Sequence, residues 1–235
     1  MPRGMCRMYA SVGPTGPPAE ELLAFRGLCE RGCGGPHDDG WGIVGYREPG
    51  APHTLGKSIE PADRDKSYEV AAHEAAAYPL VVAHLRKASL GGRTFENTHP
   101  FTMGPWTFAH NGTLDATYVQ RFGAPNQDLN DSRVFFQRLH GHLDRDPLQA
   151  LRLTLREVQE QRFPYDSLTV LLTDGRRLWA MREVREDHAY YELHWQRRGD
   201  RVVLCQEPVL DGSWEALPDR HVAVIEGGRV QVVPL

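Results

Sequence analysis

The spacing of apolar and polar residues divides the chain into segments typical of strands and of helices. Helical spacing of apolar residues predicts five helices: one after Pro17-Pro18, one over residues 63–78 that Pro79 ends, one over 115–122, one after Asn130, and one from Pro147. Short β-branched and aromatic runs predict strands at residues 6–12, 41–46, 81–85, 106–109, 168–173, 178–184, 190–195, 202–205, 221–225 and 230–233.

Turn residues separate these segments at regular points. Asp174-Gly175 and Arg198-Gly199-Asp200 are typical of hairpins, and the Gly and Pro residues at 49–52 indicate a hairpin or loop. Glycines within the strand at 41–46 indicate that something packs closely against its backbone. The order, strands with helices, then a helix pair, then strands, predicts an α+β fold with two antiparallel sheets stacked face to face and helices outside. We expect one domain over residues 1–235.

Composition narrows the classes of function. The net charge is −4 and 25% of residues are charged, which does not favour nucleic-acid or anionic-membrane binding, and no apolar run is long enough to span a membrane. Met1 to Gly4 are not followed by the apolar segment of a secretory signal. We therefore expect a cytoplasmic protein with free thiols and no nucleic-acid or membrane partner.

A metal site is one alternative that the residues raise. Cys29, Cys33 and His37 lie near one another in the sequence, but they lack the paired Cys-x-x-Cys spacing of a zinc site. We interpret the two cysteines as small apolar helix residues, and we expect neither a metal nor another cofactor.

Two of the predicted strands each end in polar residues. His84 and Arg86 end the strand at 81–85, and His110, Asn111 and Gly112 end the strand at 106–109. An arginine fork suits a carboxylate, and an Asn-Gly pair offers a side-chain amide and an unhindered N–H, which are the parts of an oxyanion hole. For Arg86 the alternative is a solvated cation, and for Asn111-Gly112 it is an ordinary turn. We expect His84 and His110 to serve packing or hydrogen bonding rather than catalysis.

The candidate nucleophile lies near the start of the chain, where Met5 directly precedes Cys6. If Met5 is the initiator and is removed, the α-amino group of Cys6, with a reference pKa of about 7.7–8.0, can act as the general base for its own thiol. The alternative is that Cys6 is an ordinary small apolar residue on a strand.

Six motifs together resemble the glutamine-hydrolysing domain of the class II glutamine amidotransferases, a family of N-terminal nucleophile (Ntn) hydrolases. They occur in the family's order over nearly the whole chain: Met5-Cys6, Asp38-Asp39-Gly40-Trp41-Gly42, His84-Leu85-Arg86-Lys87-Ala88-Ser89, Asn97-Thr98-His99-Pro100, His110-Asn111-Gly112 and Asn130-Asp131-Ser132.

The resemblance implies a four-layer αββα sandwich and a role for each matched residue. Cys6 is implied as nucleophile and base, acting through a γ-glutamyl thioester once residues 1–5 are absent or removed. The other implied roles are oxyanion binding by Asn111 and Gly112, α-carboxylate binding by Arg86, α-ammonium binding by Asp131, and lining of the glutamine pocket by Ser89 and His99. For Asp131 the alternative is a plain helix N-cap.

The sequence also departs from the synthase-linked members of that family. Pro36-His37-Asp38-Asp39 stands where they carry Arg-Gly-Tyr-Asp, and Lys87, Leu90 and Arg133 replace a Trp, a His and a Glu. These changes agree better with small stand-alone members, including the amidohydrolase that removes a γ-glutamyl group in ergothioneine synthesis. We expect a small glutamine or γ-glutamyl substrate, with ammonia released to a separate protein or to solution. The alternatives are a catalytically silent glutamine-binding or regulatory subunit and a metallohydrolase.

Overall fold

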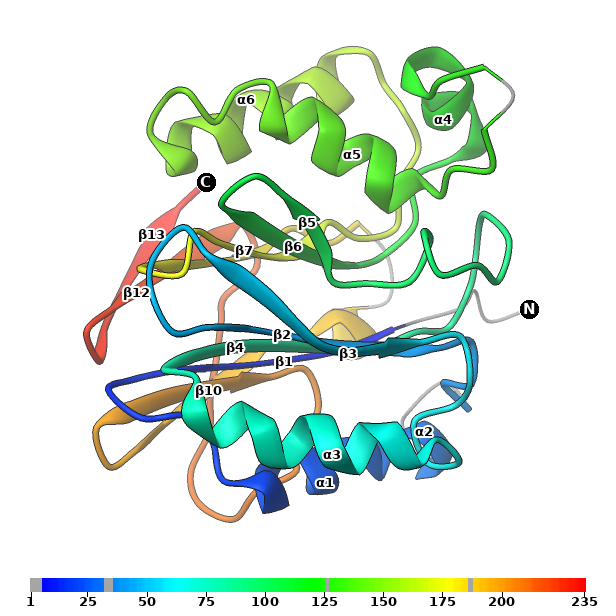
Figure 1. Cartoon of the computed structure of the whole chain (residues 1–235). Helices are drawn as coiled ribbons and strands as arrows, with labels where there is room; N and C mark the ends of the chain where they lie inside the picture. Colours follow the sequence, from blue (N-terminus) through cyan, green and yellow to red (C-terminus); the bar gives the residue numbers. More distant parts are fainter. Residues whose placement is uncertain (1–5, 32–35, 126, 186–187) are drawn as a thin grey trace.

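The computed structural model describes residues 6–31, 36–125, 127–185 and 188–235, and in it two β-sheets are stacked between two layers of helices (Figure 1). The strand pairs in both sheets are antiparallel. The α+β, four-layer αββα sandwich expected from the sequence is confirmed.

The first sheet contains the strand that follows Cys6. Its seven strands are, in spatial order, β11 (Glu215–Ala216), β9 (His194–Arg198), β10 (Arg201–Cys205), β1 (Arg7–Val12), β4 (Leu80–Leu85), β2 (Trp41–Tyr46) and β3 (Pro52–Ser58). Strand β1 therefore lies at the centre of this sheet, and all six of its residues are buried.

The second sheet has six strands and faces the first. In spatial order they are β13 (Arg229–Pro234), β12 (His221–Glu226), β8 (Leu178–Arg182), β7 (Thr169–Thr173), β6 (Trp106–Asn111) and β5 (Phe101–Met103). Strand β6 packs against both β1 and β4 of the other sheet. The ends of β1, β4 and β6 can therefore contribute side chains to one place.

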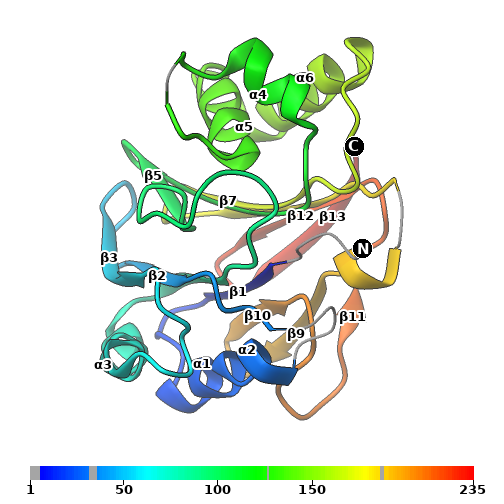
Figure 2. The ribbon, with the colours of Figure 1, turned by 90° about the vertical axis from the view of Figure 1, so that its right-hand side faces the viewer.

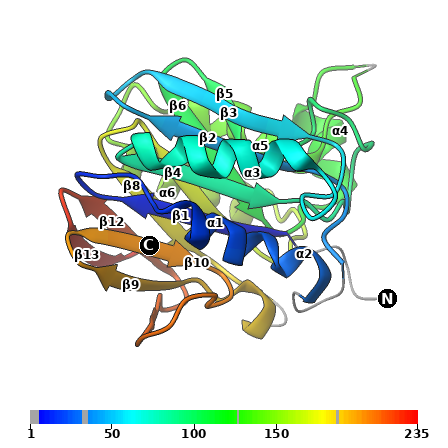
Figure 3. The same ribbon diagram turned by 60° about the horizontal axis from the view of Figure 1, so that its bottom comes forward.

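Helices cover the outer face of each sheet. The first sheet is covered by α1 (Ala19–Arg26), α2 (Leu28–Arg31), α3 (Lys66–Glu74) and the 3₁₀ turn η1 (Ala75–Ala77) (Figure 3). The second is covered by α4 (Ala116–Phe122), α5 (Asp131–His140) and α6 (Pro147–Glu160) (Figure 2). A second 3₁₀ turn, η2 (His188–Tyr191), precedes β9.

Four of these helices begin after a side chain that accepts a main-chain N–H of the first turn. The caps of α3, α4, α5 and α6 are Asp65, Asp115, Asn130 and Asp146. Each such cap typically contributes about 1 kcal/mol, because it satisfies an N–H that has no partner within the helix.

Three apolar cores fill the spaces between the four layers. One lies between α5, α6 and the second sheet, where the rings of Phe108 and Phe136 stack with centroids 4.9 Å apart. Another lies between α1, α3 and the first sheet, around Phe25 and Tyr68. The third separates the sheets and includes Met8 of β1. These cores fix the two sheets against each other.

Several predicted boundaries were wrong. The first helix is interrupted at Gly27 and continues as α2, and α3 begins after its Asp65 cap rather than at residue 63. The strand expected at 190–195 is the turn η2 followed by β9, and β8 ends at Arg182 with only an isolated bridge at Val184. The hairpin or loop expected at 49–52 is confirmed as the hairpin between β2 and β3, although strand β3 itself was not predicted.

The expected close approach to the glycines of β2 is confirmed. A Cβ added at Gly42 would lie 2.4 Å from the carbonyl oxygen of His99, and one at Gly45 would lie 2.7 Å from the ring of Tyr78. The segment carrying His99 is therefore pressed onto the backbone of the first sheet.

Candidate active site

Cys6 lies immediately before β1, between the ends of β4 and β6. It is 8% exposed, and its main-chain nitrogen donates a hydrogen bond to Asn111 Oδ1 at 2.9 Å. Its sulfur lies 3.4 Å from the main-chain nitrogen of Lys87 and 3.5 Å from the main-chain oxygen. The structure thus brings Cys6 together with residues at the ends of both strands that the sequence singled out.

Asn111 is the last residue of β6 and is fully buried. Its Oδ1 accepts from the nitrogen of Cys6, which fixes the orientation of the amide. Its Nδ2 is a buried donor without a hydrogen-bond partner among the described residues. An unpaired buried donor is costly, so such a group indicates a ligand position.

Gly112 follows with a backbone that only glycine accepts. Its φ is +146°, and an added Cβ would lie 1.9 Å from the carbonyl oxygen of Ser167. Asp166 Oδ1 holds this region by accepting from the main-chain nitrogens of Thr113 and Ser167, each at 2.6 Å. Asp166 could not be recognised from the sequence, because a lone Asp before a strand carries no distinctive pattern.

His110 braces the same segment from the core. Its Nδ1 lies 2.8 Å from the hydroxyl of Ser132 and its Nε2 lies 3.1 Å from the carbonyl oxygen of Ser167. His84 Nε2 lies 3.3 Å from the carbonyl oxygen of His110. Both histidines make hydrogen bonds within the core, which agrees with the expectation that they serve packing or hydrogen bonding rather than catalysis.

Arg86 directly follows β4 and is 2% exposed. Its main chain is fixed by the loop before β2: its nitrogen donates to Gly40 and its oxygen accepts from Asp39. Its Nη2 donates to the carbonyl oxygen of Gly92 at 3.1 Å, whereas Nη1 is buried without a partner in the described part of the chain. Burial lowers the pKa of Arg86, opposed by Cys6 and nearby carboxylates including Asp131.

Asp131 is the first residue of α5 and is also 2% exposed. Its Oδ2 accepts from the main-chain nitrogen of Leu114 at 2.7 Å, and burial raises the pKa of its carboxyl group. The cap of α5 is instead Asn130, whose Oδ1 accepts from the nitrogen of Arg133 at 2.9 Å. The predicted capping of this helix is confirmed at Asn130, and the interpretation of Asp131 as a plain N-cap is wrong.

Asn97 connects the segments that carry Arg86 and Asp131. Its Oδ1 accepts from the nitrogen of Asn130 at 3.1 Å, and its Nδ2 donates to the carbonyl oxygen of Asp128 at 3.0 Å. In return, Asn130 Nδ2 donates to the carbonyl oxygen of Asn97 at 3.1 Å. This exchange holds the loop after Arg86 against the start of α5.

Ser89 and His99 occupy different environments. Ser89 is exposed on the loop after Arg86. His99 is buried, and its ring stacks on His84 and lies tilted against Phe101, with both centroid distances 4.2 Å. Neither ring nitrogen has a partner among the described residues. Burial holds the pKa of His99 well below its usual value, so the ring is neutral. No hydrogen bond joins either residue to Cys6 in the described ranges.

A metal site was one alternative from the sequence. Cys29 is buried in α2, His37 Nδ1 lies 3.1 Å from the carbonyl oxygen of Leu28, and Cys33 lies outside the described residues. Within residues 6–31, 36–125, 127–185 and 188–235, no group of three or more His, Cys, Asp or Glu side chains could hold a metal ion. In the same ranges no helix is long and apolar enough to cross a membrane.

Residues 5–200 match the family described as glutamine amidotransferases class-II. The chain belongs to the class II glutamine amidotransferases. It is therefore an enzyme of the amidohydrolase kind. The family match confirms the resemblance found in the sequence.

Relatives of this class II amidotransferase match it along most of its length. The protein YafJ of Escherichia coli (strain K12), whose name places it among the glutamine amidotransferases, is 31% identical over 88% of this chain and 84% of YafJ. A relative from Mycolicibacterium smegmatis, named gamma-glutamyl-hercynylcysteine sulfoxide hydrolase, is 31% identical over 84% of this chain and 82% of its own.

Solved structures share the fold of this amidotransferase. A glutamine aminotransferase class-II domain protein from Silicibacter pomeroyi superimposes with a TM-score of 0.71 at 20% identity, covering 97% of this chain and 99% of that chain. The glutamine phosphoribosylpyrophosphate amidotransferase of B. subtilis gives a TM-score of 0.71 at 16% identity, covering 97% of this chain and 49% of that chain. The fold is the Ntn-hydrolase sandwich.

The thiol at the centre of this amidotransferase is protonated when Cys6 carries a peptide nitrogen. Burial raises the pKa of Cys6 to about 11, although the hydrogen bond from the main chain of Lys87 and the charge of Arg86 lower it. His84 is no substitute base, because burial lowers its pKa to about 3. Thiol chemistry at neutral pH therefore needs a further proton acceptor beside the sulfur.

Proposed function

We propose that the protein is a cysteine amidohydrolase that cleaves the side-chain amide of glutamine, or a γ-glutamyl amide, through a γ-glutamyl thioester on Cys6. The observation that carries this proposal is the 2.9 Å contact between the nitrogen of Cys6 and Asn111 Oδ1. It holds the proposed base beside the nucleophile, and it leaves the unpartnered Nδ2 of Asn111 to bind an oxyanion.

The first half of the reaction forms the thioester. With residues 1–5 absent, the nitrogen of Cys6 is an amine with a reference pKa of about 7.7–8.0, and it takes the proton from the thiol. The sulfur attacks the amide carbon, and the carbonyl oxygen becomes an oxyanion bound by Asn111 Nδ2 and the N–H of Gly112. As the oxyanion collapses, the C–N bond breaks and the leaving nitrogen takes the proton from the α-ammonium, so that ammonia or an amine departs.

The second half restores the enzyme. The α-amine of Cys6 takes a proton from water, whose oxygen attacks the thioester carbon and forms a second oxyanion in the same position. Collapse of that oxyanion breaks the C–S bond, releases glutamate and returns the proton to the sulfur. Apart from the substrate and this water, every group in the scheme belongs to Cys6, Asn111 or Gly112.

Two buried charges suit the ends of a glutamine-like substrate. The unpartnered Nη1 of Arg86 supports binding of the α-carboxylate, and the buried carboxylate of Asp131 supports binding of the α-ammonium. In this proposal Ser89 and His99 line the pocket, Ser89 from the exposed loop and His99 from its buried stack.

The name of the Mycolicibacterium smegmatis relative favours a γ-glutamyl amide of a small molecule over free glutamine. Lys87 and Arg133, which depart from the synthase-linked pattern, support the same choice. We propose that the amine or ammonia is released to solution or to a separate acceptor protein, and that the enzyme acts in the cytoplasm.

The test is hydrolysis by protein whose mass shows that Cys6 is its first residue. Glutamine and γ-glutamyl amides are offered as substrates, and glutamate release is measured against the Cys6→Ala variant. Release that the variant abolishes supports the proposal. Binding of glutamine without hydrolysis would favour the silent glutamine-binding subunit instead.

A further inference from the structure

A groove lined by arginines lies between helix α6 and the segments that adjoin β8 and β12. It encloses about 690 Å³, and its lining includes Arg152 and Arg156 of α6, Arg185, Arg220 and the carboxylate of Glu183. The chain as a whole has a net charge of −4, so the charge of this surface is opposite in sign to that of the whole chain. The residues of the groove do not include those of the proposed active site.

One wall of the groove is a polar stripe on α6. Gln149, Arg152, Arg156 and Gln159 follow one another at intervals of three and four residues, which places them on one face of the helix. Arg152 donates to the carbonyl oxygen of Pro234 at 2.7 Å. Arg156 is exposed, and its side chain has no hydrogen bond or ion pair with another described residue. Two arginines one turn apart repel each other, so the helix does not gain stability from this pair.

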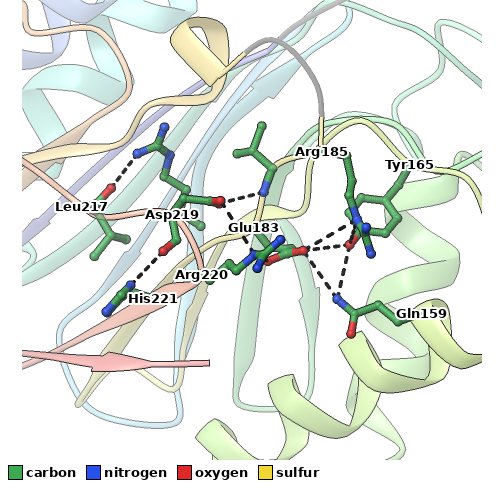
Figure 4. Close-up of polar contacts among 10 residues, drawn as sticks. Gln159, Tyr165, Glu183, Arg185, Leu217, Asp219, Arg220 and His221 are labelled. Carbon is green, nitrogen blue, oxygen red and sulfur yellow. Dashed lines mark hydrogen bonds and ion pairs between the residues drawn. The ribbon is translucent and has the colours of Figure 1, made fainter.

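The opposite wall holds two more guanidinium groups on a fixed frame (Figure 4). The hydroxyl of Tyr165 donates to the buried Glu183 at 2.8 Å and accepts from Arg185 Nε at 2.7 Å. The Nε atoms of Arg185 and Arg220 lie 3.9 and 3.8 Å from the oxygens of Glu183. Glu183 is thus shared by two arginines, and Asp219 lies 4.0 Å from Arg220, so positive charge remains in excess among these side chains.

Backbone strain coincides with this surface. Arg220, which lines the groove, has a φ of +58°. Arg162 also has a positive φ, of +56°, but it follows the C-cap of α6, where the nitrogen of Phe163 donates to the carbonyl oxygen of Val158, so its conformation is that of an ordinary helix end. The conformation of Arg220 persists because its surroundings impose it.

We propose that this groove binds a small molecule carrying at least two oxyanion groups, of which a diphosphate is the simplest. Guanidinium groups on two facing walls provide planar forks that pair bidentately with phosphate or carboxylate oxygens. Gln149 adds a neutral donor on the same face, whereas the amide nitrogen of Gln159 already donates to Tyr165 and Glu183. The volume lies within the range of small-molecule sites.

The test is calorimetric titration of the protein with pyrophosphate and, separately, with citrate. Arg156→Gln and Arg220→Gln, alone and combined, are compared with Arg64→Gln, which removes a guanidinium that is 77% exposed on another part of the surface. The side chain of Arg156 is exposed, so we expect its replacement to leave the fold intact, and melting temperatures check this for each variant.

We expect saturable binding of pyrophosphate that weakens at least tenfold in each groove variant and further in the double variant, while Arg64→Gln binds as the parent does. Tighter binding of citrate than of pyrophosphate would support the same site with a polycarboxylate ligand. The proposal is overturned if neither anion binds, or if Arg64→Gln weakens binding as much as the groove variants.

Discussion

The main-chain nitrogen of Cys6 lies 2.9 Å from Oδ1 of Asn111, although the two residues are 105 positions apart and belong to the ends of strands in opposite sheets. The contact depends on the packing of β1 against β6, so the stacking of the sheets itself assembles the site. The contact also orients the Asn111 amide: its Oδ1 accepts from the nitrogen of Cys6, and its Nδ2 has no hydrogen-bond partner among the described residues.

Replacing Asn111 by alanine should slow turnover far more than it weakens substrate binding. Loss of one oxyanion donor typically raises the barrier by about 2.7–4 kcal/mol, because the donor acts on charge that develops in the transition state. Steady-state kinetics on protein that begins at Cys6 measures this as a fall in kcat of about 10²–10³-fold. Gln120→Ala, an exposed amide on α4, is the control. An unchanged kcat would remove Asn111 from the oxyanion site.

Replacing Arg86 by lysine should raise KM and leave kcat nearly unchanged. Lysine keeps the charge but loses the fork, and the substrate carboxylate has the same charge in the ground and transition states. A charge-assisted hydrogen bond contributes about 1.5–3 kcal/mol, which corresponds to roughly a tenfold to hundredfold rise in KM. Arg64→Lys is the matched control. A normal KM with a collapsed kcat would contradict this assignment.

Replacing Asp131 by asparagine should reduce discrimination between substrates that do and do not carry an α-ammonium. The amide oxygen can still accept from Leu114, so the change removes the charge and little else. The ratio of kcat/KM for glutamine to that for glutaramate, which lacks the α-amino group, should fall at least tenfold. If Asp131→Asn lowers both values equally, Asp131 does not bind the ammonium.

Acid should destabilise the fold through His84. Burial lowers its pKa to about 3, against an unfolded value of about 6.5, so between these values the unfolded chain binds the extra proton. The free energy of unfolding should therefore decrease as pH falls below about 6.5, with His84 contributing about 1.4 kcal/mol per pH unit.

Urea unfolding of His84→Gln at several pH values measures this contribution. The variant should show a shallower decrease below pH of about 6.5 than the parent, since glutamine does not titrate. His73→Gln, an exposed histidine of α3, should behave as the parent. Identical slopes for the His84 variant and the parent would show that His84 does not control the acid transition.

The parts of the fold that the sequence could predict are those with regular apolar spacing. Strand β2 and helix α6 were found because every residue of β2 is buried and α6 carries one apolar face after Pro147. Strand β3 was missed because Pro52 and Gly56 break the pattern, which an edge strand tolerates. Strand β9 was misplaced because its alternating polar residues, such as Gln196 and Arg198, resemble a loop.

The residues of the candidate site that could be predicted from the sequence are likewise those that lie in a recognisable pattern. Arg86 and Asn111 were recognisable because polar residues at the ends of apolar strands stand out, and the family motifs included Asn97. Asp166 was not found, since its role depends on Thr113, 53 positions away in the chain, lying beside it next to the isolated bridge between Leu114 and Tyr165. Spacing along the chain contains no information about such a contact.

The central claim is that the α-amine of Cys6 is the catalytic base. Two forms of the protein test it most directly: one that begins at Cys6 and one that retains residues 1–5, each verified by intact mass. Their rates of glutamate release from a γ-glutamyl amide are measured across pH. We predict that the first form is active, that its activity falls as the amine protonates below about pH 7.7–8.0, and that the second form is inert. Equal activity of the uncleaved form would contradict the account.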